Sequence, residues 1–533
     1  MRAARDNLFR RRSRSSQWTR PQSIRVTTPA PISGWNTRDG TNELGPDECF
    51  LLDNMVPQVG GLVLRPGYKL YHEASTSELT ALLVWASGTE EKLIYATSSA
   101  LTETSGTTAT GFTGGDWMGA MMNDRLGLVN GVDAPQTYDG SAFAAMSLSG
   151  APSPNQFKGL KVFKSRSYFW GDALEFWYSQ PNALGGVLTK FPLTTVAQKG
   201  GYVVSINAWT VDGGSGPDDF FVVTTSKGEV IVYSGSNPSD ANDWALVGRY
   251  YISEPISKRG FLELDGKLYV LTKNDLELLP DRFARQTSPP SKIAKAIQES
   301  YAQYSQGPWG VYFDAKRKFI VVNVPQKQGV THQYVLANRG ACRWTRINTT
   351  GFVMFRGDFY FAGKGALGNY LLWDASTISV TQSGEWNLLR HTAQEYTTNY
   401  GIWRMDDTAA DHTDFIFFEA KTGYSPLRSN GEKRIAMYRP LFSSPGWLVL
   451  NTALSFDYDQ FWRGNYVSYQ ESQSESYWGA PWGVDWGQIQ YNRGQWLVGH
   501  GTGQTVSLRL RGLTMVPVQW AQTDWEMIPG GKY

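Results

Sequence analysis

Paired carboxylates are the residues of this chain whose type and spacing come nearest to a catalytic arrangement. Three pairs occur: Asp218 with Asp219, Asp406 with Asp407, and Asp457 with Asp459. The first two pairs stand in turn sequences, where Asp is favoured because its side chain bonds the backbone of the turn. Asp457 and Asp459 lie two residues apart in a predicted strand, so both would face one side, as a glycosidase pair requires. No third residue supports them, and we therefore assign no catalytic role to any of the three pairs.

Motifs for other chemistry are missing from the sequence. It has no G-x-S-x-G nucleophile elbow, no H-E-x-x-H zinc motif and no Walker A lysine loop. Five His and two Cys are scattered without the spacing of metal ligands. We interpret Cys49 and Cys342 as small buried side chains rather than as a disulfide. The sequence therefore predicts a protein that is not an enzyme and that has no metal site and no cofactor.

Charge is concentrated at the N-terminus. Residues 1–25, the arm, contain eight Arg, one Asp and no Lys, so the arm carries +7 and the other 508 residues sum to −5. We interpret the arm as a segment that docks on acidic groups of a partner protein, with nucleic-acid phosphate as the alternative. The proposed docking residues are Arg2, Arg5, Arg10, Arg11, Arg12 and Arg14. Neither a secretory signal nor an apolar run of membrane-spanning length is present, so we expect no stable membrane insertion.

Residues 26–77 are dense in turn signals around one short apolar segment. Pro46 suits the first position of a helix, and Cys49, Leu52 and Met55 recur at intervals of three, which predicts a short helix. We expect these residues to form a compact motif that fixes the start of the chain on a β-domain.

A hairpin is predicted directly after this helix. The sequence "RPGY" begins at Arg65 and fits a type II turn, with Pro66 at the second position and Gly67 at the third, where φ is positive. The apolar residues on both sides, in "LVLRPGYKLY" (62–71), would then be its two strands.

Regular repeats of strand, tight turn and strand follow over residues 78–382. Their most apolar strands begin at residues 92, 125, 166, 219, 267, 318 and 358, a mean spacing of about 44 residues. Four-stranded propeller blades need ~40–50 residues each. The sequence therefore predicts an all-β protein with a β-propeller of about seven blades, six or eight being possible. An array of β-sandwiches would show the same strands without the even period.

One stretch interrupts the repeats. In residues 288–305, Ile293, Ile297, Tyr301 and Tyr304 recur at helical spacing after a pair of prolines. This pattern predicts one amphipathic helix inserted between blades.

In residues 383–533 the regular spacing of apolar strands is absent, and the predicted strands are longer. We interpret this part as a second, β-sandwich-like platform domain. In "TVSLRLRGL" (505–513), apolar residues alternate with Ser507, Arg509 and Arg511, which predicts a strand with one solvated face. Arg509 and Arg511 are therefore candidates for a subunit interface. Trp520 and Trp525 are expected to lie against the core of this domain.

Three of these stretches resemble tail proteins of short-tailed bacteriophages of the tail nozzle, or tail tubular protein B, type. The N-terminal stretch combines "PISGWNTRDG" (31–40) with "LLDNMVPQVGGLVLRPGYKLY" (51–71). The middle stretch is "VYSGSNPSDANDWALVGRYYISEPISKRG" (232–260), and the C-terminal one is "WLVGHGTGQTVSLRLRGLTMVPVQWAQTDWEMIPGG" (496–531). They span nearly the whole chain in the family's order, whereas the Arg-rich arm is not part of the family's pattern.

The resemblance implies a structural protein of the virion, assembled in the bacterial host cytoplasm. It implies six copies in a ring that extends the DNA channel below the portal, bound to an adaptor ring above and carrying fibres or spikes outside. Double-stranded DNA would contact the channel only transiently. Two alternatives remain open: a carbohydrate-binding or depolymerising tail protein, suggested by the Trp-rich stretch 477–491, and the related tail hub protein.

Overall fold

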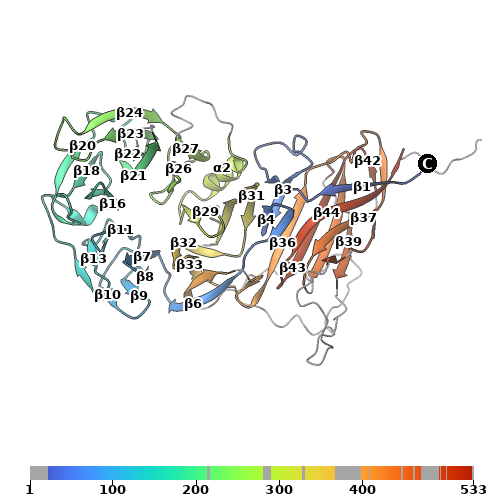
Figure 1. The fold of residues 1–533 in the computed structure, drawn as a ribbon, viewed down its shortest axis with the longest axis horizontal. Helices are drawn as coiled ribbons and strands as arrows, with labels where there is room; N and C mark the ends of the chain where they lie inside the picture. Colours follow the sequence, from blue (N-terminus) through green and yellow to red (C-terminus); the bar gives the residue numbers. More distant parts are fainter. Residues whose placement is uncertain are drawn as a thin grey trace, which may run out of the picture.

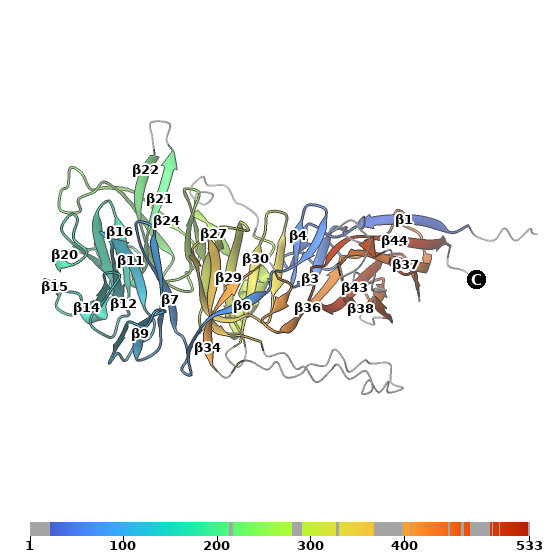
Figure 2. The same cartoon turned by 60° about the horizontal axis from the view of Figure 1, so that its bottom comes forward.

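The computed structural model describes residues 22–212, 217–279, 290–326, 330–366, 397, 399–406, 408–445, 448–459, 463–469, 491–492, 494–499 and 501–530. Within these residues the protein is almost entirely β-strand, with one α-helix, α2 (Ala294–Gln303), and one short 3-10 helix at Pro154–Gln156. Figure 1 shows two parts side by side, a ring of small sheets and a more elongated β-structure, and Figure 2 shows them in line. We call these parts the ring and the platform.

The ring consists of small antiparallel sheets that follow one another along the chain. The strands of the first sheets are β7 (Ala81–Ser87), β8 (Glu90–Ala96), β9 (Ala100–Glu103), β10 (Thr108–Thr110), β11 (Met118–Met122), β12 (Arg125–Val129), β13 (Gln136–Tyr138), β14 (Phe143–Ala145), β16 (Gly159–Phe163), β17 (Arg166–Trp170), β18 (Glu175–Tyr178) and β20 (Thr189–Pro192). Those of the later sheets are β21 (Val203–Asp212), β22 (Pro217–Thr225), β23 (Glu229–Ser234), β24 (Ala245–Tyr251), β25 (Phe261–Leu264), β26 (Lys267–Leu271), β27 (Leu276–Leu278), β28 (Gly310–Asp314), β29 (Phe319–Pro325), β30 (Thr331–Leu336), β31 (Ala341–Trp344), β32 (Asn348–Phe355), β33 (Asp358–Lys364) and β34 (Tyr400–Met405). Two short strands outside these sheets, β15 (Leu148–Ser149) and β19 (Gly186–Val187), pair with each other in parallel.

The first strand of each sheet lies at the centre of the ring. Each of these strands contacts the next, in the order β7, β11, β16, β21, β25, β28 and β32, and β32 contacts β7 again. The last sheet is completed from the other end of the chain, because β6 (Tyr68–Ser75) pairs antiparallel with β34. A closed circle of small sheets is the architecture of a β-propeller, as the spacing of the repeats predicts.

The predicted boundary of the propeller at residue 382 is too early. β34 begins at Tyr400 and pairs with β33 along its length, so the ring extends to Met405. The apolar period stops before β34 because the last sheet takes its outer strand from residues 68–75.

The platform contains two further sets of strands. One set is a sheet of β1 (Ile24–Pro29), β4 (Met55–Gln58), β5 (Gly61–Leu64), β37 (Lys433–Ser443), β40 (Tyr491–Asn492), β41 (Leu497–Val498), β42 (Thr502–Gly503) and β44 (Gln519–Pro529). The other consists of β2 (Gly34–Trp35), β3 (Glu48–Asp53), β35 (Ala410–Asp411), β36 (Asp414–Thr422), β38 (Leu448–Phe456), β39 (Arg463–Tyr469) and β43 (Val506–Thr514).

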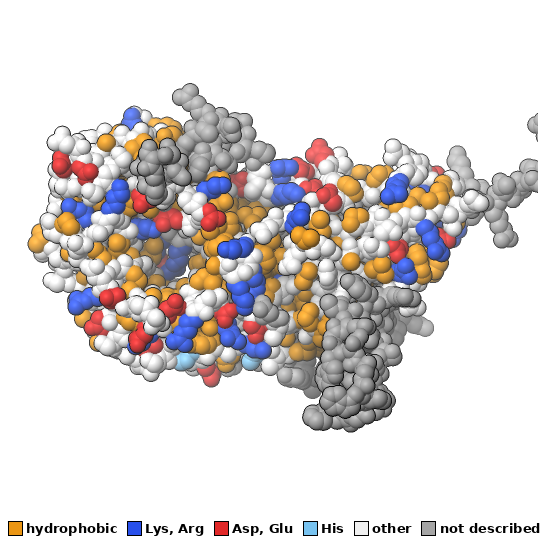
Figure 3. Space-filling view, viewed as in Figure 1, with side chains coloured by type: hydrophobic (Ala, Val, Ile, Leu, Met, Phe, Trp, Pro, Cys, Tyr) orange, Lys and Arg blue, Asp and Glu red, His pale blue; other side chains and the backbone are white. Residues whose placement is uncertain are grey.

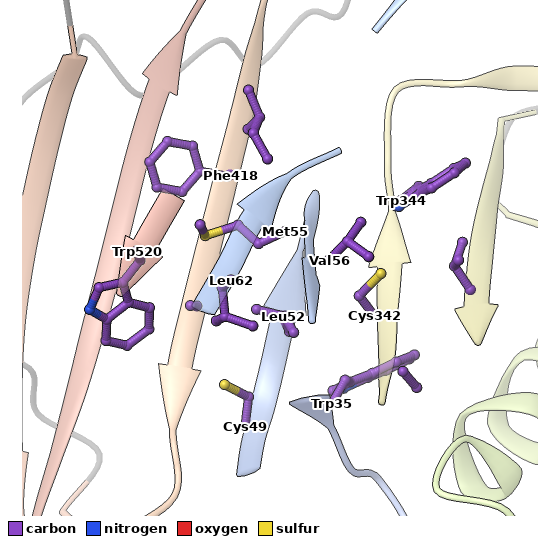
Figure 4. Packing of buried hydrophobic residues seen from close by; sticks show 14 of the residues in the cluster. Trp35, Cys49, Leu52, Met55, Val56, Leu62, Cys342, Trp344, Phe418 and Trp520 are labelled. Atoms are coloured by element: carbon purple, nitrogen blue, oxygen red, sulfur yellow. The ribbon is translucent and has the colours of Figure 1, made fainter. Parts of the chain in front are cut away.

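This second set does not end at the platform. β31 of the ring pairs with β2 and β3 of the platform, and β6 of the ring pairs with β35 of the platform. One sheet therefore continues from the ring into the platform at two places. The core is equally continuous: Figure 4 shows Trp520 and Phe418 of the platform, Leu62 and Met55 between, and Cys342 and Trp344 of the ring. The two parts are therefore joined by backbone hydrogen bonds and by shared apolar packing.

The short helix expected near Pro46 is not formed. Pro46 and Asp47 instead make a turn in which the Glu48 N–H donates to the Gly45 carbonyl at 3.1 Å, and residues 48–53 are strand β3. Proline suits the second position of a turn as well as a helix start. Pairing of β3 with β2 and β36 on its two sides outweighs the weak helical pattern.

The hairpin expected around Gly67 is also wrong. β5 pairs with β4 and β44, whereas β6 pairs with β34 in the ring, so the chain crosses from platform to ring at Arg65–Gly67. Gly67 does not have a positive φ. Glycine is needed there because a Cβ would clash with the backbone of Ala410.

The predicted amphipathic helix is confirmed as α2. Its residues Ala296 and Ile297 are buried, as is Ile293 at its start, and they contribute to the core that ring and platform share. Thr37 bonds the Lys292 carbonyl, so the helix also packs on the N-terminal segment. The helix therefore packs against this chain itself.

Trp520 provides a test of the platform core. Its side chain is 1% exposed and stacks on Phe442 at 6.3 Å between ring centroids. Trp520→Ala should lower the free energy of unfolding by roughly 3–5 kcal/mol in urea denaturation, because it removes a fully buried aromatic group. Leu246→Ala, at an exposed position of β24, is the control and should change it by only about 0.5 kcal/mol. Equal effects would contradict this assignment of the core.

Candidate functional site: a buried polar joint between ring and platform

Arg65 lies where the chain crosses from platform to ring. Its side chain and that of Asp411 are fully buried, and they form a two-point ion pair with N–O distances of 2.7 and 2.6 Å. Arg65 directly follows β5 and begins the crossing, and Asp411 lies in β35, the short strand between the ring and β36. We call the buried polar groups around this pair the joint.

All five N–H groups of the Arg65 guanidinium have acceptors. Besides the two bonds to Asp411, Nε donates to Asn54 Oδ1 at 2.8 Å, and the other two donors reach the carbonyls of Pro66 and Thr345 at 3.0 and 3.1 Å. Burial raises the pKa of the Asp411 carboxyl above its ordinary value, although the Arg65 guanidinium partly offsets this effect. A buried charge pair is tolerated when the remaining donors are satisfied in this way.

Asn54 holds the platform side of the joint. Its φ of 57° places it in the left-handed region, which Asn adopts more readily than most residues. In that position its side chain donates to Thr345 Oγ1 at 2.7 Å and to the Phe417 carbonyl at 2.6 Å. The Asn54 side chain, just after the end of β3, therefore bonds the residue that follows β31 and the backbone of β36.

Tyr68 holds the ring side. It is fully buried, and its hydroxyl accepts from the Ala366 N–H at 2.9 Å. Its backbone carbonyl accepts from the His412 N–H at 2.7 Å, and the Gly67 N–H donates to the Thr408 carbonyl at 2.6 Å. Backbone hydrogen bonds of Gly67 and Tyr68 therefore fix the crossing on the ring side of Arg65.

Further ion pairs surround the joint. Arg343 of β31 forms two bonds to Asp53 of β3, at 2.7 and 2.6 Å, and Arg346 pairs with Asp414. Each of these pairs connects a ring residue to a platform residue.

Arg509 and Arg511 do not project freely into solvent. Both guanidinium groups reach the mostly buried Glu419 carboxylate, at 2.8 and 3.1 Å, and their side chains are only partly exposed. The alternation of β43 places them on one face, as predicted, but β36 runs beside that face and supplies Glu419. They therefore stabilise the platform, and their role at a subunit interface stays a prediction.

Figure 3 shows Lys or Arg side chains in the hollow of the ring. Several ion pairs also connect separate sheets of the ring. The Lys258 ammonium, from the link before β25, donates to the Asp116 carboxylate at 2.8 Å and to the carbonyls of Asp116 and Lys158 at 2.9 and 3.1 Å. Arg259 meets the other oxygen of Asp116 at 2.8 Å. Lys161 of β16 and Glu263 of β25 form a second pair at 2.7 Å. These pairs connect sheets that are not neighbours in the circle.

The predicted carboxylate pairs are not brought together for catalysis. β38 ends at Phe456, and Asp457 follows it with φ 47°, accepting from the Gln504 and Thr505 N–H groups at 2.8 Å. It therefore caps a turn and shares no strand face with Asp459. Asp219 accepts from Thr210, and Asp406 from Lys69 and Thr408. Asp407 and the Asp218 side chain lie outside the described residues.

The docking arginines Arg2 to Arg14 and the Trp-rich stretch 477–491, apart from Tyr491, also lie outside the described residues. Arg25, at the end of the arm, is described: it lies in β1, 3.7 Å from Glu526 and 5.6 Å from the Trp496 ring. β1 pairs with β44 in the half of the platform away from the ring (Figure 1). Residues 22–25, the described end of the arm, therefore lie in that half of the platform.

Cys49 and Cys342 are both free and fully buried, as expected, and burial raises the pKa of both thiols. Among the described residues no three His, Cys, Asp or Glu side chains are grouped so that they could hold a metal ion.

The prediction that the sequence has no G-x-G-x-x-G motif is wrong. "GKGALG" (363–368) has the G-x-G-x-x-G spacing of dinucleotide-binding loops. That loop requires a strand of a parallel sheet followed by a helix. Gly363 instead lies in β33, between two antiparallel neighbours, so the described part of this segment does not have that structure.

Comparison with known proteins gives no family. No protein-family model and no curated protein matches the chain. Among solved structures, the computationally designed Ika8 protein has 9% identity and a TM-score of 0.34, over 58% of this chain and 92% of its own. YCF48 from Cyanidioschyzon merolae has 11% identity and a TM-score of 0.34, over 55% of this chain and 95% of its own. BBS1N in complex with ARL6DN has 13% identity and a TM-score of 0.27, over 40% of this chain and 71% of its own. At these values the similarities carry no argument. Within the described residues, no helix has the length and apolar content needed to cross a bilayer.

The joint can be tested by removing one charge and then both. Arg65→Met should lower the free energy of unfolding by roughly 3–5 kcal/mol in urea denaturation, because it leaves Asp411 buried without a cation. The double variant Arg65→Met/Asp411→Leu should lose less than the sum of its two single variants. Lys158→Met, which breaks the exposed pair with Asp172, is the control and should cost at most about 1 kcal/mol. A loss below 1 kcal/mol for Arg65→Met would contradict the account of the joint.

Proposed function

We propose that this protein is a structural subunit of a short bacteriophage tail, of the nozzle type. Its ring is a seven-bladed β-propeller whose last blade is completed by β6, and its platform is a β-sandwich built from the two sets of strands that share one core. Six copies stand in a ring that extends the DNA channel below the portal and adaptor, and that carries fibres or spikes outside. The protein is located in the virion and is assembled in the bacterial host cytoplasm.

The joint is the observation that carries this proposal. A subunit in the wall of a channel has to keep its shape while neighbours press on it from the sides and along the axis. Here one sheet passes from ring to platform, and the crossing is fixed by a buried guanidinium with all donors satisfied. Interfaces between mobile domains are instead small and polar. A stiff two-part block of this kind suits a structural role.

In this proposal DNA passes between the copies and not through the propeller. Lys258, Asp116 and Arg259 connect separate blades, so side chains of this chain bridge the interior of the propeller. The net charge of −5 outside the arm would weaken binding to phosphate, which suits a channel through which DNA slides. The arm, which leaves the platform at the end away from the ring, docks on the adjoining protein of the tail.

The experiment is electron microscopy of the purified full-length chain, with sedimentation velocity to count copies. We expect sixfold rings that enclose a channel, with the propellers distinct from the platforms. A variant lacking residues 1–20 should still form these rings, because β1 begins after the deleted segment, but it should fail to join the adjoining tail protein in particles.

Two results would contradict the proposal. A strictly monomeric chain at high concentration, or rings without an open channel, would exclude a conduit. Release of reducing sugar from a capsular polysaccharide that disappears in Asp457→Asn would instead favour the alternative, a depolymerising tail protein. A closed ring that caps the particle's distal end would favour the related tail hub protein.

A further inference from the structure

A groove of about 540 Å³ opens beside the joint. One wall is the β4–β5 hairpin, and the opposite wall is formed by the turns at the ends of β28 and β30. Arg65, Pro66, Thr408, Ala409 and Pro517 complete the lining. This volume lies within the range of sites that hold a small ligand or a few side chains of a peptide.

The floor and one lip of the groove are apolar. Val56, Leu64 and Phe319 are buried along the floor. Val59 is 76% exposed at the tip of the hairpin and lines the same groove. An exposed valine beside an apolar floor leaves hydrophobic surface that a ligand could cover.

The opposite rim is basic. Arg317 and Arg339 line it, and no Asp or Glu is among the lining residues. Arg317 is occupied by Asp314 at 2.8 Å. Arg339 is exposed in the turn between β30 and β31, and within the described part of the chain it has no ion-pair partner. The groove therefore combines an apolar floor with one guanidinium that is free to bind an anion.

The walls are held in place without a ligand. The Leu64 N–H donates to the Val518 carbonyl at 2.8 Å, and the Gln519 side chain donates to the Gly60 carbonyl at 3.2 Å, which fixes the hairpin. The opposite turn is closed by a bond from the Ala337 N–H to the Gly340 carbonyl at 3.0 Å. A preformed groove needs little ordering when a ligand binds.

We propose that this groove binds an extended segment of another protein that presents a carboxylate next to an apolar side chain. The carboxylate pairs with Arg339 through two parallel N–H bonds, and the apolar side chain lies between Val59 and Phe319. Charge favours this partner, because Arg339 supplies a cation and no Asp or Glu lines the groove. Nucleic acid fits less well, because phosphate backbones are held by several cations and gain nothing from an apolar floor. The inference does not depend on the ring of six copies.

The test begins with selection from a random library of 12-residue peptides displayed on yeast, against the full-length chain. We expect enrichment of sequences that place Asp or Glu beside Leu, Ile, Val or Phe. The dissociation constant of the most enriched peptide is then measured by fluorescence anisotropy, with a 20-base-pair DNA duplex as competitor. Enrichment of basic peptides, no enrichment, or displacement by the duplex would overturn the proposal.

Matched variants locate the site. Arg339→Glu should weaken binding at least 10-fold, whereas Lys267→Glu makes the same charge change at an exposed position of β26 and should leave binding unchanged. Val59→Ser should weaken it about 3- to 10-fold, while Val187→Ser, at a position 61% exposed on the ring, should not. Equal loss in a variant and its control, or binding that sedimentation traces to self-association of the chain, would contradict the assignment to this groove.

Discussion

The ion pair between Arg65 and Asp411 is the interaction on which the rest of the structure depends. Both side chains are fully buried, so each charge has lost its water and depends on the other. The pair can exist only if Asn54, Thr345 and Pro66 are placed to accept the remaining guanidinium donors. Those residues belong to different strand ends of the ring and the platform. The pair therefore couples the position of the ring to the position of the platform.

The paths of the chain explain how such a joint is built. The first 75 residues supply strands to the platform sheets and then the outer strand of the last ring sheet. Residues 400–414 return from the ring to the platform beside them. The two crossings lie side by side and are bonded to each other, so the described residues of both crossings are fixed against independent movement. The proposed function as a wall component rests on this arrangement more than on any single residue.

Local patterns in the sequence predicted the ring and α2 but not the joint. Apolar strands spaced about 44 residues apart show the repeats, and Ile293 and Ile297 show the helix, because both signals are contained within short windows. Arg65 and Asp411 are 346 residues apart in the chain, and "RPGY" looks like an ordinary turn. Cys49, Leu52 and Met55 suggested a helix because their spacing fits one, while the strands that pair with β3 come from distant segments. Arg509 and Arg511 were placed on the correct face, but Glu419 on a neighbouring strand could not be foreseen.

The central claim is that ring and platform form one rigid body with no hinge at the joint. Native-state hydrogen exchange tests it most directly, at the amides of Asn54, Arg65, Gly67 and His412, which donate across the joint. The account predicts that these amides open only with the global unfolding of the protein, with the same free energy as core amides of β33 and β43. Exchange at the joint that is orders of magnitude faster than in both cores would show a hinge and contradict the account.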